Sequence, residues 1–138
     1  MSQLSLKSML VPSKTNVVEY PGMPGFEITI SFLSREILQS IRKKSTKTTF
    51  KNRQPVEELN DELFLDLYVQ NSIKGWKGLK MSYLEQLAPV EVVAGQEDTE
   101  LEFTQDNALA LMKASTSFDS FISEQVTDLG NFSTSKQS

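Results

Sequence analysis

The sequence contains no cysteine and no histidine among its 138 residues. Without cysteine the chain can form no disulfide, no thiolate nucleophile and no cysteine-ligated zinc or iron–sulfur centre. Without histidine it lacks the commonest general base and the commonest metal ligand, so no Ser-His-Asp or Cys-His mechanism can be built within it. We therefore predict a protein that is not an enzyme, with no catalytic residues, no metal and no cofactor.

Long apolar runs are also missing. No stretch approaches the roughly 18 apolar residues of a membrane span, and residues 1–12 are too weakly apolar for a signal peptide. Apolar residues make up 38% of the chain and charged residues 23%, which is typical of a globular protein with a buried core. We expect one cytosolic domain without a membrane partner.

Charge is mildly acidic overall but is segregated along the chain. The 14 Lys and Arg against 18 Asp and Glu give a net charge of −4, which argues against a protein that coats nucleic acid. Residues 35–53 are nevertheless basic, and residues 57–66 are acidic. We favour an arrangement in which the two runs face each other or a protein partner. The alternative is salt-sensitive nucleic-acid binding through the basic run.

Neither the carboxylates nor the glycines match a ligand-binding motif. The acids of 57–66 and 97–106 lack the spacing of a calcium loop. Gly75-Trp76-Lys77-Gly78 lacks the spacing and the ending of a phosphate loop, and is read as a compact turn. Its tryptophan is an anchor of the core or of an interface, and the core is favoured.

Periodicity predicts a fold that is mainly α within the α+β class, with four to five helices and a small N-terminal β-hairpin. The hairpin joins Asn16–Tyr20 to the alternating segment Phe26–Phe32 through a Pro-Gly turn. The segment 48–50 is expected to be a short strand or a loop. The segment 101–103 is expected to be a short strand. Four helices are expected after a capping residue: 35–46 after Ser34, 61–74 after Asn60, 82–87 after Ser82 and 118–128 after Ser117. Gly75 is expected to end the second of them, and a further helix is expected to begin at Thr104.

The domain organisation follows from composition. Residues 1–15 are predicted to be a flexible N-terminal arm and residues 133–138 a disordered polar tail. Residues 16–132 would form a single domain.

Three stretches together resemble a known family. They are YPGMPGF with EITISFLSRE at 20–36, FKNRQPVEELNDELFLDLYVQNSIKGWKGLKMSYLEQL at 50–87, and FTQDNALALMKASTSFDSFISEQVTDLGNF at 103–132. In their order and pattern they resemble the tail assembly chaperones of long-tailed, siphovirus-type bacteriophages. The resemblance covers roughly residues 16–132.

The resemblance implies a role in virion morphogenesis. Such chaperones bind the tape measure protein in the host bacterial cytoplasm, keep it soluble until the tail tube polymerises, and are absent from the mature virion. Ribosomal frameshifting would yield a longer form, whose extra C-terminal domain would begin near Ser133–Ser138 and recruit the tail tube protein. Self-association as a dimer or a higher oligomer is also implied.

A chaperone for amphipathic helices needs an apolar groove with a charged rim. The apolar residues expected to line the groove are Leu63, Leu67, Trp76, Leu79, Phe118, Phe121 and Ile122. The charged rim is expected at Arg42, Lys43, Lys44, Lys47, Glu57 and Glu58. Two other functions stay open: a structural minor tail or connector protein, and a small nucleic-acid-binding regulator that uses residues 35–53.

Overall fold

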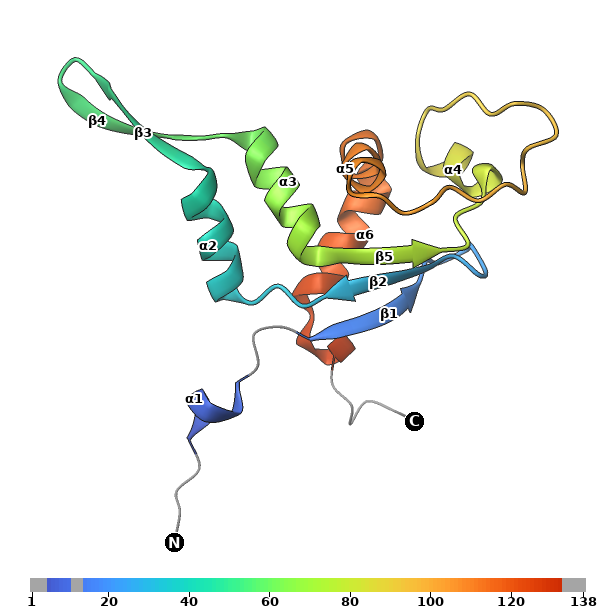
Figure 1. The fold of residues 1–138 in the computed structure, drawn as a ribbon, viewed down its shortest axis with the longest axis horizontal. Helices are drawn as coiled ribbons and strands as arrows, with labels where there is room; N and C mark the ends of the chain where they lie inside the picture. Colours follow the sequence, from blue (N-terminus) through green and yellow to red (C-terminus); the bar gives the residue numbers. More distant parts are fainter. Residues whose placement is uncertain (1–4, 11–13, 133–138) are drawn as a thin grey trace, which may run out of the picture.

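The computed structural model describes residues 5–10 and 14–132 (Figure 1). Its helices are α1 (Leu6–Met9), α2 (Arg35–Ser45), α3 (Asp61–Ser72), α4 (Met81–Leu87), α5 (Gln105–Ala114), α6 (Thr116–Thr127) and the 3-10 helix η1 (Leu129–Phe132). Its strands are β1 (Thr15–Glu19), β2 (Glu27–Ser31), β3 (Thr46–Lys51), β4 (Gln54–Leu59) and β5 (Ile73–Lys77). The predicted tail 133–138 lies outside the described residues, as does part of the predicted arm 1–15.

The predicted fold class, mainly helical with one hairpin, is wrong. The described residues hold five strands in two sheets, ordered β1-β2-β5 and β3-β4. With 46% helix and 24% strand, the chain is an α+β mixture. The error arose because α2 passes directly into β3, and α3 directly into β5, with no turn residue between them. Gly75 was expected to end a helix, but the helix ends at Ser72 and Gly75 lies inside β5.

The predicted N-terminal hairpin is confirmed and forms two-thirds of the larger sheet. Strand β2 is central and antiparallel to both β1 and β5, with Ile28 opposite Val18 on one side and Trp76 on the other. Ile28 and Ile30 are fully buried, as the alternation of apolar residues predicted. One face of this sheet therefore carries the core.

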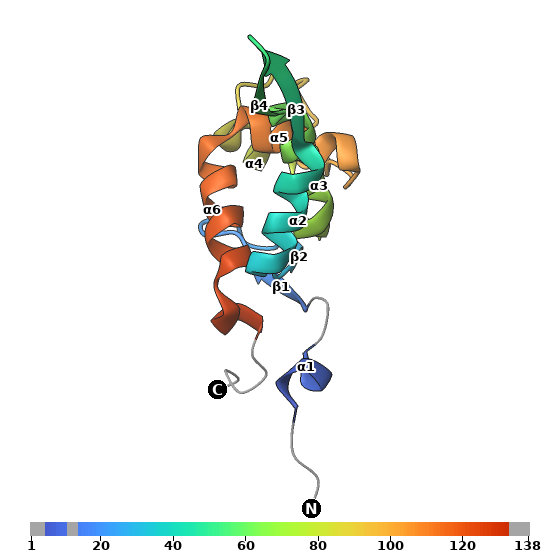
Figure 2. The same ribbon diagram turned by 90° about the vertical axis from the view of Figure 1, so that its left-hand side faces the viewer.

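The helices α3, α5 and α6 lie on one side of this sheet (Figures 1 and 2). Helix α6 contributes its apolar stripe, and Phe118, Ile122 and Val126 are all fully buried. Phe26 stacks against Phe118, with ring centroids 6.4 Å apart. The core thus joins the N-terminal sheet to the C-terminal helix.

Trp76 is part of this core. Its ring meets Phe103 edge-on at 5.1 Å between centroids, and it also contacts Phe26 and Phe118. The indole N–H donates a hydrogen bond to the carbonyl of Leu101 at 2.9 Å. The segment predicted as a turn is therefore a strand that presents a tryptophan to the aromatic cluster.

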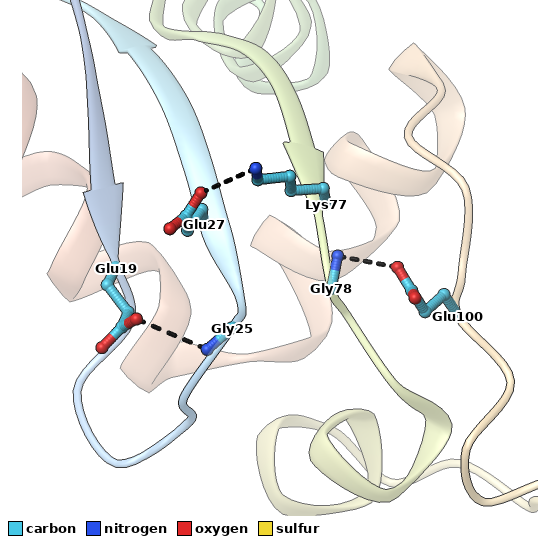
Figure 3. A network of polar contacts seen from close by, with 6 residues as sticks. All are labelled: Glu19, Gly25, Glu27, Lys77, Gly78 and Glu100. Carbon is cyan, nitrogen blue, oxygen red and sulfur yellow. Dashed lines mark hydrogen bonds and ion pairs between the residues drawn. The ribbon is translucent and has the colours of Figure 1, made fainter.

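Polar contacts hold the end of β5 to β2 on one side and to Glu100 on the other (Figure 3). Glu27 pairs with Lys77 across the two strands at 3.1 Å. The N–H of Gly78 donates to Oε1 of Glu100 at 2.8 Å, and Gly78 has a φ of 76°. A Cβ atom on Gly78 would collide with the carbonyl oxygen of Gly25. Only glycine allows this approach of two backbones.

The two predicted helix caps Ser34 and Asn60 are confirmed, and Thr104, where a helix was expected to begin, is also a cap. The side chains of Ser34, Asn60 and Thr104 each accept a hydrogen bond from the backbone N–H three residues later. The last helix begins two residues earlier than predicted, because Ser115, and not Ser117, is its cap. Helix α4 begins at Met81, so Ser82 is inside it.

Ser115→Ala is expected to lower the free energy of unfolding by about 1–2 kcal/mol. Ser115 is 1% exposed, and its Oγ accepts from the N–H of Phe118 at 3.1 Å. Alanine would leave this buried N–H without a partner. Chemical denaturation measures the loss, and the control Ser117→Ala, at an exposed position, is expected to change stability by less than about 0.5 kcal/mol. Equal losses in the two variants would reassign the cap.

Candidate protein-binding surface

Strands β3 and β4 form a two-stranded hairpin, here called the arm (residues 46–59), which projects from the helices that carry it (Figures 1 and 2). Six residue pairs run without a register shift from Thr46 opposite Leu59 to Lys51 opposite Gln54. The connecting residues Asn52 and Arg53 have φ values of 53° and 67°. Positive φ at both positions of a two-residue loop is typical of a type I′ turn, whose twist suits a hairpin.

The arm has a fixed base. Ile41 and Ser45 of α2 are each 2% exposed, and the hydroxyl of Ser45 donates to the carbonyl of Ile41 at 2.7 Å. The N–H of Asn60 donates to the carbonyl of Ser45 at 2.8 Å, which joins the end of α2 to the start of α3. The two strands therefore leave the body from adjacent points.

Opposite charges lie side by side on the arm. Lys47 is opposite Glu58, and Thr48 is opposite Glu57. Lys51 pairs with Glu58 at 3.4 Å, although both side chains are more than half exposed. The basic and acidic runs were expected to face each other or a protein partner, and they meet along the arm through this one ion pair. Exposed pairs of this kind add at most about 1 kcal/mol, so they bias the pairing of the strands without fixing it.

A shallow groove, here called the cationic groove, opens where the arm leaves α2. Its lining comes from the end of α2 and from both strands of the arm: Gln39, Arg42, Lys43, Thr46, Thr48 and Glu57. Lys44 and Lys47 are exposed close to it in the sequence. None of the four cations forms an ion pair with another described residue. Arg42 lies 5.9 Å from the centre of the Phe64 ring, which holds its guanidinium over α3.

Phe50 is the most exposed large apolar side chain of the described residues, at 73%. It lies near the end of the arm, opposite Pro55. In a strand, residues two apart share a face, so Phe50 is on the same face as Thr46 and Thr48 of the cationic groove. An exposed aromatic side chain on the face of the arm that also lines the cationic groove is typical of a protein-binding surface.

Residues 22–138 match the model of one protein family, described as the YdaY prophage protein. The chain belongs to the YdaY prophage protein family. The chain therefore originates from a bacteriophage, and this part of what the resemblance implied is confirmed. No curated protein and no solved structure matches the chain. The matched residues include the whole arm and the whole cationic groove.

The YdaY-family chain does not bring the seven predicted groove residues into one exposed groove. Leu79, Phe118 and Ile122 are completely buried. Trp76 is half-buried in the aromatic cluster, and Phe121 is half-buried against the ring of Tyr20. Of the two α3 residues, Leu67 is half-buried and Leu63 is 38% exposed. Only Leu63 is open to a partner without disturbance of the core.

The predicted rim residues, in contrast, gather around the arm. Arg42, Lys43 and Glu57 line the cationic groove, and Lys44 and Lys47 are exposed and next to groove residues in the sequence. Glu58 is on the neighbouring strand and pairs with Lys51. Sequence reasoning missed the arm itself, and with it the exposure of Phe50. The signal that could have found it is Asn52, a residue that tolerates positive φ, between two segments of similar length.

In the described part of the chain, no group of three Asp or Glu side chains is placed to hold a metal ion. Burial raises the pKa of Tyr68, against a lowering by its hydrogen bond to Ser123, and this pair joins α3 to α6. Among the described helices, none is long and apolar enough to cross a membrane.

Proposed function

We propose that this prophage protein is a tail assembly chaperone. In this account it is not an enzyme: it binds the tape measure protein in the host bacterial cytoplasm, keeps it soluble until the tail tube polymerises, and is absent from the finished virion. The observation that carries the proposal is the arm, which exposes Phe50 near its end and, on the same face at its base, a groove whose cations have no ion partner among the described residues. Bacteriophage origin supports a role in phage biology.

The surface suits a helical client. A long amphipathic helix offers an apolar stripe with charged flanks, and it binds where apolar anchors lie beside charges of the opposite sign. Phe50 would take the apolar stripe, with Leu59 and Leu63, which are 40% and 38% exposed, at the base of the arm. Arg42 and Lys43 would take acidic flanks. Because each exposed charge contact is weak, the client can be released when the tail tube forms.

Nucleic acid is not part of the proposal. The basic strand β3 lies directly beside the acidic strand β4, so the arm does not present the unbroken row of cations that follows a phosphate backbone. The basic run would have to meet phosphates next to Glu57 and Glu58.

Co-expression with the tape measure protein of the same prophage tests the function. The tape measure protein is expected to be insoluble alone, and soluble and co-purified when the chain is present. A tape measure protein that stays insoluble and does not co-purify would contradict the proposal.

Phe50→Ala is expected to weaken binding of the tape measure protein by roughly tenfold or more, because an aromatic anchor at an interface contributes about 2 kcal/mol. The matched control is Val93→Ala, which removes an apolar side chain of similar exposure, 66%, from the loop after α4. Titration of the purified proteins measures the two affinities. If Phe50→Ala binds as tightly as the control, the arm is not the binding surface.

A further inference from the structure

The turn of the arm holds an unusual conformation. Within the described part of the chain, Asn52 and Arg53 are the only residues other than glycine with positive φ. Asparagine tolerates this region, but the Cβ atom of arginine is crowded there. Glycine is the usual second residue of such a turn. The closed hairpin therefore keeps its tightest turn in a strained form, and an extended backbone would relieve the strain.

The register of the arm continues through this turn. Because the six pairs run unbroken to Lys51 opposite Gln54, the next pair in the same register is Asn52 opposite Arg53. Within one chain these two residues form the turn and cannot pair in this way. Between two copies these residues can pair, because the pairing of the strands is symmetric about the point between Asn52 and Arg53.

We propose that the arm opens and that two copies of this chain exchange halves through it. Residues 46–59 of each copy then form one continuous strand, which pairs antiparallel with the same strand of the second copy. All six pairs of the closed arm form again between the copies, the Lys51–Glu58 ion pair included. Asn52 and Arg53 gain two further pairs and leave the strained region.

The exchange leaves each body unchanged. In each body, β1, β2 and α2 come from one copy, and α3 to α6 with β5 come from the other. The contacts of the core are the same as in the closed chain. Because the arm projects from the body, nothing else has to move (Figures 1 and 2).

A second copy is the partner that fits, because it alone supplies the same acidic strand in the same register opposite Lys47 and Lys51. It also completes the cationic groove. Arg42, Lys43, Thr46 and Thr48 would come from one copy and Glu57 from the other. The dimer thus carries two such grooves, one at each end of a shared ribbon.

A disulfide placed across the arm separates the two forms. Thr48 and Glu57 are opposite each other and exposed, and the chain has no cysteine of its own. The variant Thr48→Cys/Glu57→Cys is refolded at increasing concentration, oxidised and run on a non-reducing gel. We expect a covalent dimer whose share rises with concentration. The single variant Thr48→Cys is expected to run as a monomer on the same gel, because the two copies of residue 48 are too far apart in the ribbon to form a disulfide. An internally linked monomer at every concentration would overturn the proposal.

A change at the turn tests the cause. Arg53→Gly removes the crowded Cβ atom and so stabilises the closed turn. Each dimer that dissociates forms two closed turns, and the dimer dissociation constant is therefore expected to rise by roughly 30-fold. The matched control Arg53→Ala removes the same charge but keeps the Cβ atom, and is expected to dimerise like the natural chain. Sedimentation of the purified chain alone measures both constants. Equal dimerisation of the two variants would contradict the role of the turn, and neither experiment requires the tape measure protein.

Discussion

Trp76→Ala is expected to lower the free energy of unfolding by about 3–5 kcal/mol, which is typical of a large aromatic side chain removed from a core. Its ring contacts Phe26, Phe103 and Phe118, and its indole N–H is bonded to the carbonyl of Leu101. Alanine would leave a cavity at the centre of this cluster and one carbonyl without its donor. Urea denaturation followed by circular dichroism measures the loss.

Trp76→Phe is the matched control for this prediction. It keeps an aromatic ring in the cluster and removes the hydrogen bond, so we expect a loss of about 1–2 kcal/mol. If Trp76→Ala were as stable as the natural chain but failed to bind the tape measure protein, Trp76 would be an interface anchor, and the packing described here would be wrong.

Gly78→Ala is expected to cost about 3 kcal/mol or more, from two causes that add. The residue has a φ of 76°, a region that crowds any Cβ atom. The new Cβ atom would also meet the carbonyl oxygen of Gly25, which is backbone and is fixed by the turn that precedes β2 (Figure 3). Thermal and urea denaturation both report the loss.

Two other glycines separate these causes. Gly22 has a φ of 79° but open space around its Cβ position, so Gly22→Ala is expected to cost about 1 kcal/mol. Gly75 has open space and no positive φ, and Gly75→Ala is expected to be close to neutral. A Gly78→Ala variant no less stable than Gly22→Ala would show that the two turns move apart easily.

The parts of the fold that were predictable are those with a local signal. The alternation at 26–32 predicted a half-buried strand, and a capping side chain predicted the start of α2 and of α3. Strands β3 and β5 had no such signal, because each continues directly from a helix. Where a helix ends without glycine or proline, partners distant in the sequence decide the conformation: β5 forms because β2 is there to pair with it.

The candidate site divides in the same way. Charge patterning favoured that the runs at 35–53 and 57–66 face each other or a protein partner, and residues 47–51 and 57–58 of these runs do lie on paired strands of the arm. The apolar groove was not predictable, since interface and core residues are chemically alike, and Phe118 and Ile122 turned out to be completely buried. The exposure of Phe50 was not predictable either. It follows from the arm, which the sequence pattern left undecided between strand and loop.

The most direct test of the chaperone function is the content of the assembled particle. A lysogen that carries this prophage is induced, and the chain and the tape measure protein are quantified by mass spectrometry in the cleared lysate and in purified tails. The account predicts that the chain accompanies soluble tape measure protein in the lysate and is missing from tails that contain the tape measure protein. A chain present in purified tails at a fixed copy number would contradict it and would identify a structural tail component.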